Sequence, residues 1–259
     1  PARRAGAAIP LRGRNPWGRN PTGDWRLGRG FYSCWMGSGN RLLGDRAGAT
    51  RWAAALGVIA AVLFVVVGMP GLRDLVQPLD EWFRELAIQL EWQPAVEVAD
   101  ALRVIGSAWV MVPIEIAIGF LLLLRRRWHA LVFWAVSVGL VYALVLITKV
   151  LYDRPRPPDS LVATTGASFP SGHSATAAVV AIGLVILFAP IARSRWHWYL
   201  VAASWPILMA ASRVYLRAHW FTDVVAGVTL GAAVALVVAL LVDRWKSGID
   251  ADEGQPPDV

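Results

Sequence analysis

Cysteine is almost absent from this chain, since Cys34 is the one cysteine in 259 residues. A single cysteine excludes an intrachain disulfide and any metal site built from several cysteines. Histidine is also scarce, with four residues in the whole sequence. Two of these histidines in one cluster of motifs are therefore strong candidates for functional residues.

Acidic residues are outnumbered, with 18 Asp and Glu against 25 Lys and Arg, which gives a formal net charge of +7. Residues 1–51 contain ten arginines against Asp24 and Asp45. Residues 1–48 also lack a sustained apolar period, so we expect a basic, disordered cytoplasmic segment that is not a signal peptide. In a membrane protein such a segment indicates topology or contact with lipid headgroups, and nucleic-acid binding is a weak alternative.

Hydrophobic residues make up 56% of the chain, which is too apolar for a typical soluble domain. The sequence therefore predicts an all-α integral membrane protein with one membrane domain, residues 49–243, and a short cytoplasmic tail, residues 244–259. A membrane-spanning helix needs about 20 apolar residues, and the first and fifth candidates are short by this measure. The six expected spans are 52–68, 107–124, 128–148, 174–192, 198–211 and 221–242.

Basic residues in the connections between these stretches indicate the orientation. With six spans, the N-terminal segment and three basic segments lie on one side of the membrane. These segments contain Arg125–Arg127, Arg193 with Arg195, and Arg244 with Lys246. Because positive charge is retained in the cytoplasm, we expect both termini to lie on the cytoplasmic side of the plasma membrane. Residues 69–106, 149–173 and 212–220 then lie outside, and the amphipathic segments of 69–106 are expected to lie along the membrane surface.

Three polar clusters occupy the outer ends of the expected spans, at residues 149–157, 170–173 and 212–223. They contain three cations, Lys149, Arg156 and Arg213. Charged groups at a membrane face are functional candidates, and arginine can bind two phosphate oxygens at once while lysine acts as a point charge. Ser171 and the amides near Gly172, at the start of a helix, add neutral donors. This set suits a tetrahedral phosphoryl group.

Two histidines complete the same clusters. His219 and Asp223 are four residues apart at the start of a helix, so they share one face. A carboxylate that binds one ring nitrogen leaves the other free to attack phosphorus. His173, from another helix, can protonate the leaving alkoxide and then deprotonate water. The sequence thus predicts a phosphohistidine intermediate, with no metal and no cofactor.

Three further charged residues have no catalytic interpretation from the sequence. Arg154 and Arg217 are interpreted as interfacial anchors, because a long basic side chain near a membrane usually extends its head to the lipid surface. Glu115 lies within an apolar stretch and has no assigned role.

The ordered clusters resemble the signature of the type 2 phosphatidic acid phosphatase superfamily: Lys-x6-Arg-Pro, Pro-Ser-Gly-His and Ser-Arg-x5-His-x3-Asp. Here 12 residues separate the first two motifs and 38 separate the last two, within a resemblance that covers about residues 50–243. The resemblance implies a six-helix membrane bundle and metal-independent hydrolysis of phosphomonoesters or pyrophosphates at the outer membrane face. It also implies His219 as nucleophile, Asp223 as its partner and His173 as acid and base. The implied phosphate ligands are Lys149, Arg156, Ser171, Gly172 and Arg213.

The leading functional hypothesis is a lipid phosphate phosphatase. Its candidate substrates are phosphatidic acid, phosphatidylglycerol phosphate and prenyl pyrophosphates, between which the sequence does not decide. A lipid phosphotransferase would use the same site, and a non-catalytic lipid-phosphate binder or transporter is a third hypothesis. Both histidines and Asp223 argue against mere binding, since binding needs only the cations. The oligomeric state stays open.

Overall fold

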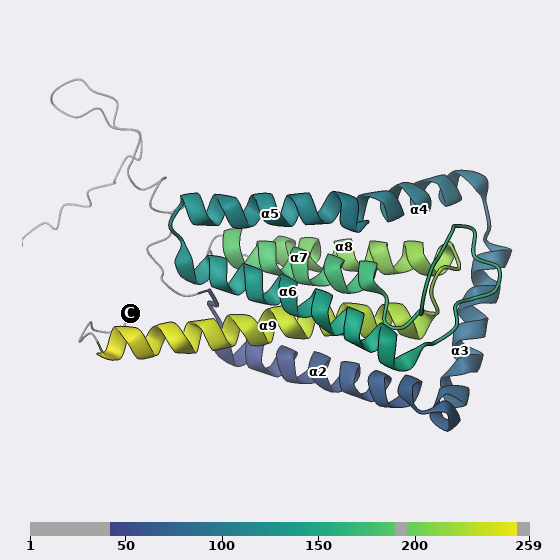
Figure 1. Cartoon of the computed structure of the whole chain (residues 1–259), viewed down its shortest axis with the longest axis horizontal. Helices are drawn as coiled ribbons and strands as arrows, with labels where there is room; N and C mark the ends of the chain where they lie inside the picture. The colour runs from purple at the N-terminus through teal and green to yellow at the C-terminus, as the bar shows by residue number, and fades with distance from the viewer. Residues whose placement is uncertain (1–41, 190–195, 253–259) are drawn as a thin grey trace, which may run out of the picture. The chain divides into compact units, whose positions relative to one another are not determined.

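The structure, a computed structural model, describes residues 42–189 and 196–252, and within these ranges every regular element is an α-helix. The helices lie in one compact unit that begins at Arg41 (Figure 1). In chain order they are α2 (Arg46–Gly68), α3 (Pro70–Gln89), α4 (Gln93–Ile105), α5 (Ala108–Leu124), α6 (Trp128–Tyr152), α7 (Gly172–Phe188), α8 (Trp196–Tyr215) and α9 (Phe221–Asp252).

Two helices extend past the bounds expected for the membrane domain, and the domain bounds themselves stay a prediction. Helix α2 includes residues 46–48 of the segment expected to be disordered, and α9 continues through the expected tail as far as Asp252. The physical reason is a contact between the two ends: the buried carboxylate of Asp243 accepts the N–H groups of Leu42 and Leu43 at 2.7 and 3.1 Å. Residues 1–41, which include Cys34, and 253–259 lie outside the described residues, so disorder there stays a prediction.

Several helices have the length and composition of membrane spans. Helices α2, α6 and the part of α9 from Phe221 to Ile249 qualify singly, and α4 with α5 qualifies as a pair bent by 45°. Helix α7 is apolar but shorter. Large apolar side chains cover the outer faces; Val58 and Ile116, for example, are 62% and 66% exposed. Such faces suit contact with lipid, whereas the predicted number of six spans stays a prediction.

Helix α7 is the central element and packs against α6, α8 and α9 (Figure 1). Its contact with α9 is unusually close, because two glycines of α9 face the backbone of α7. A Cβ on Gly227 would lie 2.5 Å from the carbonyl oxygen of Ser171, and a Cβ on Gly231 would overlap that of Ala175. Small residues four apart allow this approach, as in other membrane helix pairs. The approach fixes the start of α7 beside the start of α9.

We expect Gly231→Ala to destabilise the protein, because the added methyl group must displace the α7 backbone at Ala175. Overpacking of this kind costs about 1–3 kcal/mol. Thermal unfolding in detergent should show a lower apparent Tm. The matched control is Gly139→Ala in α6, where a Cβ meets nothing within 4 Å. An equal loss of Tm in both variants would contradict the close packing of α7 on α9.

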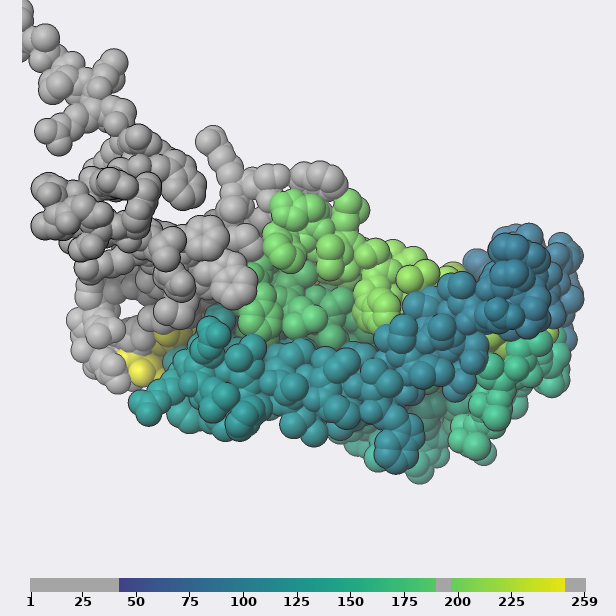
Figure 2. Space-filling model, turned by 90° about the horizontal axis from the view of Figure 1, so that it is seen from above, coloured from purple at the N-terminus to yellow at the C-terminus, as the bar shows by residue number. Residues whose placement is uncertain are grey.

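Helices α3, α4 and α5 cover the bundle from outside. Helix α3 crosses the end where α6 finishes and α9 begins (Figure 1). On it, Phe83 stacks on Phe221, the first residue of α9, with ring centroids 3.8 Å apart. Figure 2 shows α4 and α5 as one continuous band beside α7 and α8. The end of the bundle that carries all three motif clusters is therefore partly covered by α3 and α4.

Candidate active site

The fold brings the three motif clusters to one end of the helix bundle. Lys149 lies in the last turn of α6, and Arg213 lies in the last turn of α8. Ser171 caps α7, His219 lies in the connection before α9, and Asp223 lies in the first turn of α9. The backbone N–H of Ser171 donates to the carbonyl oxygen of Asp223 at 3.0 Å, which joins the second cluster directly to the third.

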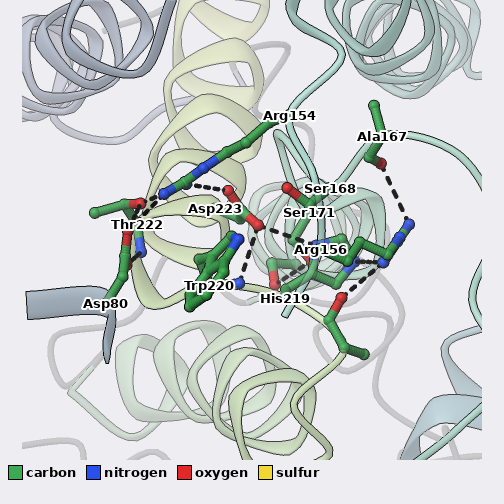
Figure 3. Close-up of polar contacts among 12 residues, drawn as sticks. Asp80, Arg154, Arg156, Ala167, Ser168, Ser171, His219, Trp220, Thr222 and Asp223 are labelled. Carbon is green, nitrogen blue, oxygen red and sulfur yellow. Dashed lines mark hydrogen bonds and ion pairs between the residues drawn. The ribbon is translucent and has the colours of Figure 1, made fainter. Parts of the chain in front are cut away.

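His219 and Asp223 face each other as the spacing predicts. The His219 Nδ1 atom lies 3.5 Å from Oδ2 of Asp223, somewhat longer than an ordinary hydrogen bond. The other ring nitrogen, Nε2, lies 3.2 Å from Nη1 of Arg156. A guanidinium can only donate, so Nε2 must accept, which assigns the ring proton to Nδ1 on the side of Asp223 (Figure 3).

The ring of His219 is neutral in this environment. Burial lowers the pKa of His219 to about 4, and the bond and charge of Asp223 counteract only part of that effect. At neutral pH the imidazole therefore carries a lone pair on Nε2 rather than a second proton. A neutral imidazole oriented by a carboxylate has the form required of a nitrogen nucleophile.

Two of the predicted phosphate ligands are held by backbone carbonyls of one loop. The guanidinium of Arg156 donates to the carbonyls of Thr165, Gly166 and Ala167 at 3.0–3.3 Å. The Lys149 ammonium also donates to the carbonyl of Ala167. Residues 165–167 therefore hold the two cations together, with Arg156 next to His219. To bind phosphate in bidentate fashion, Arg156 must exchange some of these carbonyls for phosphate oxygens.

The remaining cation and the second histidine carry buried polar atoms that lack partners. Among the described residues, Nε and Nη1 of Arg213 and Nε2 of His173 have no hydrogen-bond partner. Burial, together with the positive charge of Arg213, lowers the pKa of His173 to about 3, so the free site holds His173 neutral. Because buried polar groups are normally hydrogen-bonded, unpaired donors beside two histidines indicate a site for a polar, anionic ligand.

The second cluster supplies backbone donors at the start of α7. Ser171 does not cap the helix with its hydroxyl, which instead accepts a hydrogen bond from Ser174 at 3.0 Å. The first N–H groups of a helix have no intrahelical partner, and the helix dipole favours an anion there. Gly172 leaves room at this point, since a Cβ on it would meet only Val145, at 3.5 Å.

The interpretation of Arg154 and Arg217 as interfacial anchors is wrong. Arg154 is 1% exposed, and its Nη1 atom lies 2.6 Å from Oδ1 of Asp223. Arg217 is 6% exposed and forms ion pairs with Glu91 and Asp159 at 2.7 and 3.1 Å. Neither guanidinium group extends to the lipid surface, because carboxylates in the buried site and in the loops neutralise the two positive charges.

The contact between Arg154 and Asp223 is the functional feature that sequence reasoning missed. The signal was present but weak: Arg154 lies two residues before Arg156, in the same cluster. Which of several arginines in such a cluster meets a given carboxylate depends on the fold of the loop. No spacing rule connects residues that are 69 positions apart.

In the described ranges, no three His, Cys, Asp or Glu side chains converge as a metal site would require. The metal independence implied by the sequence stays a prediction.

Residues 130–247, which contain all three clusters, match the family model of the PAP2 superfamily. This segment of the chain is therefore similar to the PAP2 superfamily. This result confirms the resemblance inferred from the three motifs. It also agrees with the position of the matched segment, which runs from α6 to α9 and thus includes every residue of the candidate site.

Two known relatives of this chain are named as phosphatases of lipid phosphates. The chain is 29% identical over 191 residues to phosphatidylglycerophosphatase B of Bacillus subtilis, covering 71% of this chain and 94% of the relative. It is 30% identical over 139 residues to an undecaprenyl-diphosphatase of Sulfolobus acidocaldarius, covering 51% of this chain and 63% of that relative.

A solved structure resembles the fold as a whole. The crystal structure of a transmembrane PAP2-type phosphatidylglycerolphosphate phosphatase from Bacillus subtilis has a TM-score of 0.62 at 28% identity, covering 76% of this chain and 96% of that one. With the apolar helices described above, this similarity places the chain among membrane proteins.

Proposed function

We propose that this protein is an integral membrane phosphatase that removes phosphate from a lipid phosphomonoester or pyrophosphate through a phosphohistidine. The observation that carries the proposal is the geometry of His219. Its Nδ1 faces Asp223 and its Nε2 lies beside Arg156, so the lone pair of the ring points toward a cation that can hold phosphate. The lipid phosphatases among its relatives support the substrate class.

The reaction we propose has two steps. Nε2 of His219 attacks phosphorus and the ester P–O bond breaks. His173, which takes up a proton when the bound phosphate dianion offsets the charge of the surrounding cations, gives that proton to the leaving alkoxide. Neutral His173 then takes a proton from water, whose oxygen attacks phosphorus and breaks the P–N bond. Inorganic phosphate leaves and His219 is restored. In both steps Lys149, Arg156 and Arg213 stabilise negative charge on the phosphoryl oxygens, and Ser171 with the α7 amides near Gly172 adds donors.

An apolar cavity beside the site suits the hydrocarbon part of such a substrate. It has a volume of about 420 Å³, lies between α3, α8 and α9, and is lined almost entirely by apolar side chains. Val214 and Val224 contribute to its wall and directly follow Arg213 and Asp223 in the chain. The cavity thus borders the helix ends that carry the phosphate site.

The proposed topology has six spans, with both termini in the cytoplasm and the site on the outer face of the plasma membrane. Its basis is the distribution of basic loops. To test it, Leu161→Cys, in the loop between α6 and α7 and 37% exposed, is combined with Cys34→Ala. We expect an impermeant thiol reagent to label this variant in intact cells. Arg125→Cys, at the other end of α6, should react only after permeabilisation, and the reverse pattern would invert the orientation.

The function itself is tested by phosphate release from purified protein in detergent. The panel contains phosphatidic acid, phosphatidylglycerol phosphate and a prenyl pyrophosphate, each with and without EDTA. We expect free phosphate from at least one lipid and nearly unchanged rates in EDTA, because cations of the chain itself hold the phosphate. Loss of activity in EDTA with rescue by Mg²⁺ would contradict the mechanism. Transfer of phosphate to an added alcohol without its release in water would instead establish a phosphotransferase.

A further inference from the structure

Asp80, on the covering helix α3, is a buried carboxylate with no role in the mechanism above. It is 1% exposed, although α3 is amphipathic and lies across the end of the bundle (Figure 1). Figure 3 shows its contacts with Arg154 and Thr222. Its Oδ2 atom accepts hydrogen bonds from Nη2 of Arg154 at 2.7 Å and from the hydroxyl of Thr222 at 2.8 Å. Its Oδ1 atom accepts from the backbone N–H of Thr222, also at 2.8 Å.

These contacts favour the ionised form of Asp80. Burial raises the pKa of Asp80 above its usual value, and Arg154 and both bonds from Thr222 limit that rise. The guanidinium and the backbone N–H can only donate. The Thr222 hydroxyl accepts from Nη1 of Arg154 at 2.8 Å, so its own proton points to Asp80. Every contact therefore presents a hydrogen to the carboxylate, which leaves no acceptor for a proton on Asp80.

The same guanidinium links Asp80 to the catalytic centre. Nη1 of Arg154 donates to Oδ1 of Asp223 at 2.6 Å while Nη2 binds Asp80. The other Asp223 oxygen, Oδ2, accepts from the backbone N–H of Trp220 at 3.0 Å and faces His219. One oxygen of Asp223 thus faces Arg154, and the other faces His219.

Asp80 also holds the start of α9 itself. Thr222 is the second residue of α9, so its N–H is one of the groups that the helix leaves unpaired. A carboxylate from α3 binds this N–H across the interface, where the helix dipole favours negative charge. The stacking of Phe83 on Phe221 fixes the same contact one turn further along α3. Helix α3 therefore binds the start of α9, which carries Asp223, and supplies one of the partners of Arg154.

We propose that Asp80 is a positioning residue of the phosphatase site, acting through Arg154 and Thr222 on Asp223. Because Arg154 is shared between Asp80 and Asp223, these three side chains together carry a net charge of −1. This charge stabilises the positive imidazole that forms when His219 is phosphorylated. Without Asp80, Arg154 would neutralise Asp223 alone and the start of α9 would lose a partner. The inference rests on the proposed function, because its effect appears in the chemical step.

The test compares Asp80→Asn with Asp74→Asn, an exposed aspartate on the same helix, as matched control. Asparagine at 80 can still accept from the Thr222 N–H, and Arg154 keeps Asp223, so no buried charge is left unpaired. We expect Asp80→Asn to lower kcat about 10- to 100-fold. A loss of this size is typical when a residue that orients a functional group by hydrogen bonding is replaced. KM should change less than about threefold, because the phosphate ligands are untouched. The control should match the wild type.

A second variant tests the inference in case Asp80→Asn does not fold. Thr222→Val removes the hydroxyl between Arg154 and Asp80 but keeps the backbone N–H, and it should lower kcat in the same direction by a smaller factor. Monodispersity and apparent Tm in detergent are measured for every variant. If Asp80→Asn does not fold, the Thr222→Val result decides.

Three outcomes would overturn the inference: an unchanged kcat in both folded variants, a rise in KM with kcat unchanged, or an equal loss in Asp74→Asn. If the wild type itself releases no phosphate from any lipid in the panel, the proposed function fails and the inference falls with it. An active wild type with an equally active Asp80→Asn variant removes the inference alone.

Discussion

His219→Ala should abolish phosphate release from every substrate, by about 10⁴-fold or more, as expected when the nucleophile of a covalent mechanism is removed. Nothing near His219 can replace it. Its Nε2 is the atom beside Arg156, and Asp223 behind it accepts hydrogen bonds from Arg154 and from the Trp220 N–H. The variant should therefore also form no covalent phosphoenzyme, whatever the leaving group.

The matched control is His129→Ala. His129 lies at the start of α6, whereas Lys149 lies in its last turn, and its ring contacts Trp245. We expect wild-type rates for this variant in the same phosphate-release assay. Both proteins should show the wild-type apparent Tm within a few degrees, since neither substitution removes a charge that the site carries at neutral pH. Substantial activity in His219→Ala would exclude His219 as the attacking group.

His173→Ala should have an effect that depends on the leaving group. A lipid alkoxide leaves poorly and needs a proton, which His173 is proposed to donate, and general acid catalysis contributes a factor of about 10²–10⁴. A nitrophenolate leaves well without that proton. The loss in kcat/KM should thus be about 10²–10⁴-fold on a lipid phosphate and much smaller on a nitrophenyl phosphate, because kcat/KM reports the attack by His219 and not the later hydrolysis.

The two substrates are compared by kcat/KM in the same detergent preparation. His219→Ala serves as the reference, because its loss should be complete on both substrates. An equal loss on both substrates in His173→Ala would indicate that His173 binds phosphate or supports the site instead of donating a proton. The position of His173 fits either role, since its Nε2 is buried without a hydrogen-bond partner among the described residues.

Much of the site was predictable because its residues lie close together in the sequence, where helix geometry fixes their relative positions. His219 and Asp223 are four residues apart, and Ser171 and Gly172 begin a helix, so local geometry alone places them. The resemblance to the superfamily, inferred from three ordered motifs, is confirmed by the match over residues 130–247. The starts of α5 and α6 were predicted to within one residue of Ala108 and Trp128, because polar or basic residues end the apolar runs there.

The contacts between distant segments were not predictable. Arg154 and Asp80 are 74 positions apart, and the amphipathic pattern of α3 indicated only a surface helix. A charged residue on the buried face of such a helix is visible in the sequence, but its partner is not. The same holds for the extended α9, whose Asp243 binds the chain before α2 about 200 positions earlier, at Leu42 and Leu43. Periodicity describes one helix at a time, whereas these contacts depend on how helices pack.

The most direct test of the central claim is to identify the phosphorylated residue. The wild-type protein is mixed with a ³²P-labelled lipid phosphate, quenched rapidly without acid, since phosphohistidine is acid-labile, and digested for peptide mapping. The geometry of His219, with Nδ1 toward Asp223 and Nε2 toward Arg156, predicts phosphate on Nε2 of His219. The label should accumulate more strongly in His173→Ala with a nitrophenyl phosphate, because the base for hydrolysis is absent. Phosphate mapped to His173 would mean that the two histidines have the opposite roles and would contradict the account.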